Sequence, residues 1–550
     1  MKGYAESVAF LGTWGCFQAV IFFLLCVSIV PNGFGAFALV FLVDVPPHHC
    51  SVPVDNLTEE WQRAAIPVEV VNGVEERSRC SRYRLDVVMN LSAQGFAPGD
   101  VNLTELQQEP CVDGWSYSKD IYQSTIVTEF DLVCHDEWKQ PFTASVLYAG
   151  ITCGSLLTGE LSDKYGRKPI LFATMAVQTI FTLIQVFANS WILFTILLFF
   201  NGLGQMSNYV AALVLGAEIL IGHARVVYSS AAVNSSFALG YMMLPLLGYC
   251  LRDWRSLLLG MALPGLLYIP MWWLIPESPR WLLYQGKVQE AEAIFRKAAR
   301  WNKVQAPQYI FDQYMVPEKE KAQEKKNYST LDLFKISKLR VTTLTLFLIW
   351  FNMFISYYAL SLNTSQLHTN PFLSCFIFAL VEIPAYVCSW LALRYLPRRT
   401  SIITTLCLGS VPLFLLELVP HDLSTVTLIM EMLAKFFFAC GTSLLFTYTS
   451  ELYPTPLRTT ATGTCSMVSR IGSCFAPFLL KLSVFLKYLP HITMASMALL
   501  AASATLFIPE SFGLPLPETF EQMATRKRIQ CLCDRNKEPN RTLVPAEEPL

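Results

Sequence analysis

Charge is scarce in this chain. Its 550 residues include 41 Lys and Arg and 42 Asp and Glu, together 15%, and the net charge is −1. That balance excludes the strongly basic surface that nucleic-acid binding requires, so no nucleic-acid partner is expected. The apolar runs also lack a nucleophile–base pairing, a metal-ligand spacing and a cofactor fingerprint. The sequence therefore argues against an enzyme and predicts no metal or organic cofactor.

Apolar residues, by contrast, make up 53% of the chain and gather in long runs. A run of about 20 apolar residues crosses the ~30 Å hydrocarbon core as a helix, and twelve such runs predict an all-α polytopic protein in a lipid bilayer. The first run lacks a small-residue cleavage site, so we expect a retained helix. The expected division is a cytosolic N-terminus (1–16), a first transmembrane helix (17–42), an extracellular loop (43–141), helices 2–6 (142–275), a cytosolic helical loop (276–340), helices 7–12 (341–508) and a cytosolic tail (509–550).

The first long loop combines cysteines with glycosylation sequons. Its cysteines are Cys50, Cys80, Cys111 and Cys134, and its sequons begin at Asn56, Asn90 and Asn102. This combination predicts an extracellular, glycosylated and disulfide-tied loop, with the pairing left open. The basic stretches DKYGRK, RYLPRR and PLRTT fall on the other side, so the positive-inside rule predicts cytosolic termini and a multi-pass protein of the plasma membrane.

An internal repeat divides the chain in two. The stretches GAEILIGHAR and TSELYPTPLR each carry a Glu seven residues before an Arg, and the two acids, Glu218 and Glu451, are 233 residues apart. Glu277 in IPESPRWLL and Glu510 in IPESFGLPLPET are separated by the same 233 residues. The repeat predicts two six-helix halves related by duplication, with a substrate site at the midplane between them.

Charged residues beside these motifs are interpreted as a cytosolic gate. Their ion pairs would close the inner side when the site faces outward, and so bias alternating access. The expected members are Asp163, Arg167, Lys168, Glu218, Arg225, Glu277, Arg280 and Arg458.

Several motifs resemble one transporter family. GELSDKYGRKP resembles the loop motif of the major facilitator superfamily, and PESPRWL and ELYPTPLR resemble the organic-ion transporter family. STIVTEFDLVC and GQMSNYVAALVLGAEIL are similar to the organic cation/carnitine transporter branch. The resemblance implies the major facilitator fold and secondary transport of small zwitterions or cations, such as carnitine and ergothioneine, by alternating access.

One departure from that branch concerns the energy source. Members carry a stretch resembling a phosphate-binding loop after the fourth helix, but here it reads GAEILIGHAR and lacks the Gly-Lys-Ser/Thr ending. Without that ending nothing would cradle nucleotide phosphates, so we expect no ATP and transport driven by a gradient.

Arg470 and Glu382 are two of the ionisable residues that fall inside apolar runs. Arg470, in SMVSRIGSCFAPF, is twelve residues from Arg458, which places it about 18 Å along its helix, and Glu382 lies equally far from Arg394. A charge at this depth costs at least ~2.5 to 3.5 kcal/mol unless it faces a cavity or a partner. The two residues could neutralise each other, or Arg470 could bind a substrate carboxylate bidentately. The resemblance supports the second interpretation, because its anion and carnitine branches carry Arg at the matching position.

A quaternary ammonium needs aromatic faces and a diffuse negative field, since it has no N–H donors. Phe237 precedes Arg470 by 233 residues and is its expected symmetry mate. Glu431 and Lys435 are spaced i, i+4 and are expected to pair locally. Besides Arg470 and Glu382, the substrate-binding candidates are Gln205, Asn208, Tyr209, Phe237, Tyr358 and Phe446.

Sodium coupling depends on three further candidates. Asn32, beside Pro31 and Gly33, could offer oxygen ligands or could mark a helix kink. The resemblance associates the residues matching Asn32, Tyr448 and Glu451 with sodium coupling, whereas Glu451 could instead be a gate residue paired with Arg458 or with loop charges. The alternatives are a polyspecific cation or anion exchanger or uniporter without sodium, and a ligand sensor that does not transport. A functional monomer is expected.

Overall fold

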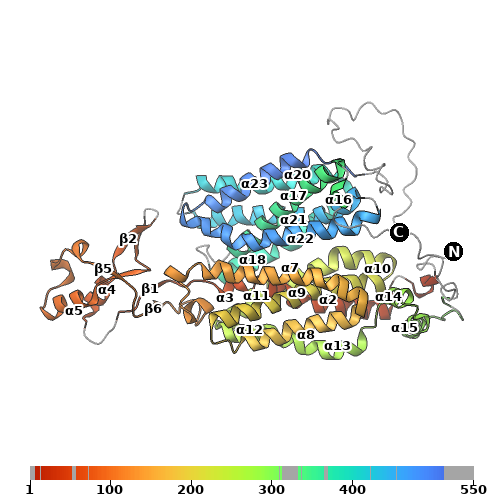
Figure 1. Cartoon of the computed structure of the whole chain (residues 1–550), viewed down its shortest axis with the longest axis horizontal. Coiled ribbons are helices and arrows are strands. Elements are labelled where there is room, and N and C mark those ends of the chain that lie inside the picture. The colour runs from red at the N-terminus through yellow and green to blue at the C-terminus, as the bar shows by residue number, and fades with distance from the viewer. Residues whose placement is uncertain are drawn as a thin grey trace.

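The computed structural model describes residues 7–12, 14–52, 57–71, 74–308, 310–311, 332–335, 337–363, 370–420, 423–453 and 455–512. Its helices form two stacked blocks, one from the first half of the chain and one from the second (Figure 1). A cysteine-rich segment projects from one end of the bundle, at the left of Figure 1. We call this end the cysteine-rich end, and the opposite end, where the chain turns at Gly166, the Gly166 end.

Among the residues that the structure describes, the N-terminal block contains six helical segments, several of them interrupted. Phe194, Leu197 and Leu198 illustrate how apolar side chains on one face of a helix join the shared core. The segments are α2 (Cys16–Phe37) with α3 (Leu39–Leu42), α7 (Lys139–Tyr165), α8 (Arg167–Gln185), α9 (Trp191–Ile219), α10 (Gly222–Val227) with η5 (Tyr228–Ala232) and α11 (Val233–Cys250), and α12 (Trp254–Ala262) with η6 (Leu263–Leu267) and α13 (Tyr268–Leu274).

The C-terminal block also contains six helical segments among the described residues. Trp350, Phe438 and Leu445 are fully buried at its centre. Its segments are α16 (Asp332–Lys335) with α17 (Ser337–Leu362), α18 (Pro371–Leu380) with α19 (Glu382–Tyr395), α20 (Arg398–Leu415) with η9 (Leu416–Leu418), α21 (Ser424–Leu452), α22 (Thr455–Lys481) with η10 (Leu482–Val484), and α23 (Leu489–Thr505).

Ten of the described helical spans are long and apolar enough to cross a membrane. Helix α11 and the shorter apolar helix α23 pack among them and complete six segments in each block. Many large apolar side chains on the outside of the bundle are exposed, as expected where lipid replaces water. The predicted all-α polytopic architecture in two halves is confirmed.

The cysteine-rich segment holds the small amount of strand that the structure describes. Disulfides join Cys50 to Cys111 and Cys80 to Cys134, which confirms the predicted disulfide-tied loop and decides the pairing. Three antiparallel pairs form within it. Its elements are β1 (His48–Cys50) paired with β6 (Trp115–Tyr117), β2 (Val68–Val71) with β3 (Val74–Arg77), β4 (Ser81–Tyr83) with β5 (Gln108–Pro110), and the helices α4 (Glu59–Ala64), α5 (Leu85–Ala93), η2 (Pro98–Asp100), η3 (Leu103–Glu105), α6 (Ile126–Glu129) and η4 (Cys134–Asp136).

A buried arginine organises this segment. Arg82 is 2% exposed and contacts Glu109 at 2.9 Å and Asp113 at 2.6 Å, while its Nη1 donates to the carbonyl of Ser51. A buried guanidinium requires such compensation. Two of the predicted sequon asparagines, Asn90 and Asn102, are exposed, and Asn56 lies outside the described residues.

Three short helices lie at the Gly166 end, namely η1 (Ala9–Leu11), α14 (Pro279–Tyr284) and α15 (Val288–Trp301). The apolar face of α15 is buried through Ala291, Phe295 and Ala298. Just beyond it, Asn302 accepts a hydrogen bond from the backbone N of Phe17 and donates to Gln18 Oε1 at 2.7 Å. This contact fixes the first turn of α2 against the segment that joins the two halves.

Candidate functional site

Arg470 lies on α22 and is 8% exposed. Its Nη1 donates to the hydroxyl of Tyr358 at 3.3 Å, and its guanidinium lies 5.5 Å from the ring centroid of Phe354. Among the described residues, no carboxylate forms an ion pair with it and its Nε has no hydrogen-bond partner. Arg470 is therefore a nearly buried cation whose donors are only partly satisfied by the protein.

Glu382 does not pair with Arg470. Its Oε1 lies 3.1 Å from Nζ of Lys435, and both side chains are fully buried. Tyr357 donates to the same carboxylate at 2.5 Å and Tyr386 at 3.4 Å. The alternative in which Glu382 neutralises Arg470 is wrong, because α19 packs against α21, which carries Lys435, rather than against α22.

The expected local pair of Glu431 and Lys435 is also wrong. Glu431 Oε1 lies 3.0 Å from Nε2 of His491, and both carboxylate oxygens accept from Asn363 at 3.2 Å. The i, i+4 spacing allowed the local pair, but each residue finds a partner on a different neighbouring helix. A buried charge gains more from a fixed partner in the core than from a flexible local one.

These pairings determine which charge remains without a counter-ion around Arg470 and Glu382. With Glu382 matched by Lys435, Arg470 is the charge that has no counter-ion among the described residues. A positive charge in a low-dielectric surrounding attracts an anion strongly. The arrangement can therefore hold a carboxylate beside Arg470, and Glu382 is not free to hold a substrate ammonium.

Aromatic rings connect Arg470 to the other half. Tyr358 packs 5.0 Å from Tyr148 and 5.7 Å from Phe37, measured between ring centroids. Phe37 in turn lies 6.2 Å from Phe237, which lies 6.2 Å from Tyr209. The structure thus joins three predicted aromatic candidates through Phe37 of α2, which the sequence analysis missed. We call Tyr358, Phe37, Phe237 and Tyr209 the aromatic wall.

Phe446, the fourth aromatic candidate, lies farther from the guanidinium. Its ring packs 4.6 Å from Trp350, which stacks on Phe354, the ring beside Arg470. Phe446 is 40% exposed, so one of its faces is not covered by protein. Two rings, those of Trp350 and Phe354, therefore lie between Phe446 and Arg470.

The polar candidates of α9 bind the backbone of α2. Gln205 Nε2 donates to the carbonyl of Asn32 at 2.7 Å, and Asn208 Nδ2 donates to that of Ser28 at 3.1 Å. Asn208 also approaches Asn32 Oδ1 at 3.4 Å. Gln205 Oε1 and Asn208 Oδ1 are buried acceptors without a described partner.

Tyr209, the next residue on α9, points away from this cluster. Its hydroxyl lies 3.3 Å from Asn234 Oδ1, and its ring contacts Phe237. The three neighbouring candidates of α9 therefore divide into two that hold α2 and one that belongs to the aromatic wall.

The three sodium-coupling candidates do not lie together. Asn32 is buried in the N-terminal half with Gln205 and Asn208. Tyr448 donates to the carbonyl of Pro509 at 2.8 Å, and Glu451 pairs with Arg398, both in the C-terminal half at the Gly166 end. The alternative interpretation of Glu451, a gate residue paired with a loop charge, agrees with this contact.

At the Gly166 end, Arg167 anchors a network in the N-terminal half. Its Nε lies 3.1 Å from Glu218 and its Nη1 lies 2.7 Å from Asp163. Glu277 accepts from the backbone N of Arg167 at 2.9 Å and of Lys168 at 3.0 Å. The hydroxyl of Ser278 donates to Glu218.

The C-terminal half contains the same network. Arg398 lies 3.3 Å from Glu451, and Glu510 accepts from the backbone N of Arg398 at 2.8 Å and of Arg399 at 3.0 Å. Ser511 donates to Glu451 at 2.7 Å. The 233-residue repeat pointed to these positions, yet the sequence analysis omitted Arg398, Ser278 and Ser511 from the gate.

The remaining gate candidates lie around these networks. Glu218 pairs with Arg167 rather than with Arg225, seven residues later, which is exposed. Arg280 is half-buried on α14, and the side chain of Arg458 lies outside the described residues. The ion pairs of Arg167 and Arg398 each stay within one half, so they brace the two halves separately and do not tie one to the other.

Contacts between the halves occur toward the cysteine-rich end. Lys481 pairs with Glu137, and Ser145 donates to the carbonyl of Cys474 at 2.6 Å. The ring of Phe372 stacks 5.2 Å from Phe41. These contacts close the bundle on the side from which the cysteine-rich segment projects.

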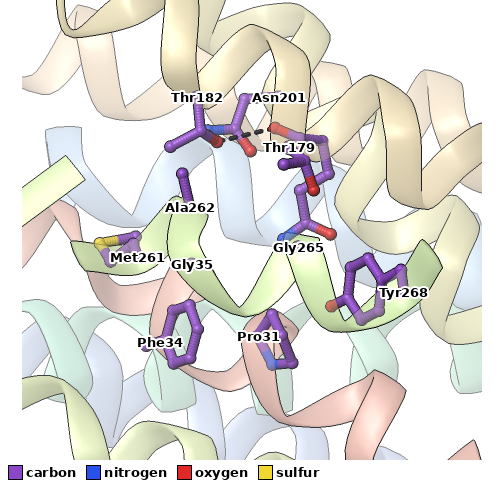
Figure 2. Close-up of a pocket in the computed structure, with 11 residues that line it drawn as sticks. Pro31, Phe34, Gly35, Thr179, Thr182, Asn201, Met261, Ala262, Gly265 and Tyr268 are labelled. Atoms are coloured by element: carbon purple, nitrogen blue, oxygen red, sulfur yellow. Dashed lines mark hydrogen bonds between the residues drawn. The ribbon is translucent and has the colours of Figure 1, made fainter. Parts of the chain in front are cut away.

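We call Arg470 and the rings that connect it to the other half the central cluster. A small cavity inside the N-terminal half is separate from this cluster (Figure 2). It is lined by residues of α2, α8, α9, α12, η6 and α13, and Asn201 donates to Thr182 at 2.9 Å on its wall. Its volume of about 10 Å³ is close to what one water molecule occupies. Neither Arg470 nor Glu382 lines it, so it is too small and too remote to hold an organic substrate.

Comparison with known proteins gives consistent matches. Residues 105–523 match the family described as Sugar (and other) transporter. The chain is 47% identical to Solute carrier family 22 member 4 of Mus musculus, covering 96% of each protein. It is 45% identical to Organic cation/carnitine transporter 2 of Homo sapiens, covering 96% of this chain and 95% of the relative.

The fold is also similar to solved structures. The inward-open xylose transporter XylE from E. coli matches with a TM-score of 0.60 at 14% identity, covering 91% of this chain and 98% of that one. At this identity the likeness concerns the fold alone, which is that of the major facilitator transporters.

Proposed function

The chain is a multi-pass membrane transporter of the sugar and other transporter family, and we propose that it carries small organic zwitterions that bear a carboxylate. Its relatives include a protein named for organic cations and carnitine. Carnitine and ergothioneine combine a carboxylate with a quaternary ammonium, and they are the substrates we propose for this chain. Transport proceeds by alternating access of the two halves around the central cluster.

The observation that carries this proposal is the state of Arg470. It is nearly buried, it has no carboxylate partner among the described residues, and its Nε is unsatisfied. A planar guanidinium binds a carboxylate through two parallel hydrogen bonds, which a substrate could supply. A simple cation would meet only repulsion at this position.

Ring faces beside Arg470 suit the ammonium end of such a substrate. Tyr358 contacts the guanidinium directly, and Phe37 and Phe237 extend the aromatic wall into the other half. A quaternary ammonium is attracted to ring faces through their quadrupole. A zwitterion lying along this wall would contact both halves at once and so favour their closure around it.

Sodium coupling is part of the proposal at Asn32. Sodium requires several oxygen ligands, and the buried acceptors Gln205 Oε1 and Asn208 Oδ1 lie beside Asn32 without a described partner. We place the coupling ion there rather than at Tyr448 and Glu451, whose contacts are occupied elsewhere. Exchange or uniport without sodium is the competing proposal.

The remaining parts of the proposal concern location. The plasma membrane, an extracellular cysteine-rich segment and cytosolic termini are supported by the two disulfides, the exposed sequon asparagines and the basic motifs at the Gly166 end. We propose that the monomer is the functional unit, because each half supplies part of the central cluster.

Uptake of radiolabelled carnitine, ergothioneine and tetraethylammonium, with and without sodium, tests the proposal in wild type and Arg470→Ala. In Arg470→Ala we expect the uptake of carnitine and ergothioneine to be lost. The uptake of tetraethylammonium should be unchanged or higher. Equal loss of all three at equal surface expression would contradict the carboxylate role. If carnitine uptake is unchanged when choline replaces sodium, sodium coupling is ruled out. Stimulation of uptake by internal substrate would then identify an exchanger.

A further inference from the structure

Lys435 lies in an aromatic cage built from both halves. Its Nζ lies 3.7 Å from the ring centroid of Tyr357, 5.4 Å from that of Phe37 and 5.5 Å from that of Tyr241. Each ring is within the ~6 Å at which a cation is attracted to an aromatic face. Phe37 and Tyr241 belong to α2 and α11 of one half, and Tyr357 and Lys435 to α17 and α21 of the other.

The same cage contains a carboxylate. Glu382 lies 3.1 Å from Nζ of Lys435, and the hydroxyl of Tyr357 donates to it at 2.5 Å. Aromatic faces around a negative charge are the surroundings that a quaternary ammonium requires, since it can donate no N–H hydrogen bond. Chemically, the cage is an ammonium-binding site, and in this protein a side chain of the protein itself occupies it.

We propose that Lys435 is a tethered occupant that excludes substrate ammonium groups from this cage and thereby determines the charge selectivity of the transporter. The inference rests on the proposed function, in which a substrate binds beside Arg470. It assigns to Lys435 the exclusion of simple cations from this cage, in addition to the repulsion that they meet beside Arg470.

The tether gives Lys435 a large advantage over a free cation. Its side chain is fully buried, pairs with Glu382 and donates to Ser361, so it is already ordered in the cage. A tethered group acts at an effective concentration of about millimolar or more, which a dilute substrate cannot match. A zwitterion avoids this competition because its carboxylate has Arg470 as a separate anchor, whereas a simple cation has none.

Emptying the cage tests the proposal with tetramethylammonium as the probe. Lys435→Ala removes the tethered ammonium and leaves Glu382 and the three rings, so we expect saturable tetramethylammonium uptake to rise at least about tenfold per transporter at the surface. Lys435→Met removes the charge but keeps the cage filled, and no such rise is expected. Lys287→Ala, which alters an exposed lysine of the segment between the halves, controls for expression.

The double variant Glu382→Gln/Lys435→Ala identifies the origin of any gain. It keeps the empty cage but removes the negative charge, so the gain should disappear. Lys435→Ser is a second empty-cage variant, so the test does not depend on the folding of one substitution. Equal tetramethylammonium uptake in wild type, Lys435→Ala and Lys435→Ser would overturn the proposal, as would an undiminished gain in the double variant.

Thermal stability of the purified variants separates this proposal from the proposed function. Stabilisation of Lys435→Ala or Lys435→Ser by tetramethylammonium, absent in wild type, supports the cage even if no zwitterion is transported. Folded variants that tetramethylammonium does not stabilise overturn the cage, even if carnitine uptake in wild type confirms the proposed function.

Discussion

Glu382 and Lys435 form a fully buried ion pair whose charged atoms lie 3.1 Å apart. The pair leaves Arg470, on the neighbouring helix α22, as the cation without a carboxylate partner among the described residues. Glu382 therefore neutralises Lys435 and not Arg470, as the sequence had allowed. Four predictions follow from this arrangement and from the contacts that support it.

Breaking the buried pair should destabilise the protein more than removing it. Glu382→Gln leaves the ammonium of Lys435 buried without its counter-ion, which costs about 3–5 kcal/mol. The double variant Glu382→Gln/Lys435→Met removes both charges and should recover most of that loss. Thermal unfolding in detergent measures the effect, and a double variant as unstable as the single one would contradict the pairing.

Arg470→Lys should weaken binding of carboxylate substrates while preserving the charge. An ammonium cannot form the two parallel hydrogen bonds of a guanidinium, and losing one charged hydrogen bond costs about 1.5–3 kcal/mol. We expect KM for carnitine to rise about tenfold or more. The control is Arg252→Lys, a partly exposed arginine beside Tyr249, which should leave KM unchanged. An unchanged KM in Arg470→Lys would show that charge alone is sufficient.

Reversing one charge of a gate ion pair should lower Vmax, and exchanging both charges should restore part of it. Arg398 and Glu451 are 15% and 20% exposed and lie 3.3 Å apart, so Arg398→Glu or Glu451→Arg places like charges together. We expect Vmax to fall about tenfold in each single variant and to recover partly in the double variant. The matched exchange of Arg167 and Glu218, which lie 3.1 Å apart, should recover less, because Arg167 also pairs with Asp163. A double variant no better than the single ones would exclude a simple ion pair.

Gly33 should tolerate no side chain. A Cβ at this position would lie 2.1 Å from the backbone oxygen of Phe237, because α2 and α11 approach closely there. Gly33→Ala must therefore separate two helices that shape the central cluster, and we expect a loss of several kcal/mol, on the order of other overpacked cores. Gly463→Ala is the matched control, since a Cβ there meets nothing within 4 Å and should stabilise α22 slightly. Thermal unfolding of both variants provides the test.

The fold could be predicted from the sequence because its signals are local or periodic. Runs of about 20 apolar residues mark helices regardless of how these pack, and the 233-residue offset between Glu277 and Glu510 marks the duplication without any structure. The depth of Arg470 and Glu382 followed from the rise per residue of a helix. The four loop cysteines predicted disulfides, but three pairings were possible and only the folded segment selected one.

The partners of the charged residues required the tertiary structure. Spacing allowed Glu431 to pair with Lys435, but Lys435 faces α19 and Glu431 faces α23, so each found another partner. Similarly, only the packing showed that Asn32 contacts Asn208, whereas Tyr448 donates to the carbonyl of Pro509. The sequence by itself determined which charges enter the membrane and how deep they lie, because hydropathy and helix rise are properties of a single segment. Only the packing of helices determined which charge meets which, because that depends on the faces that neighbouring helices present to one another.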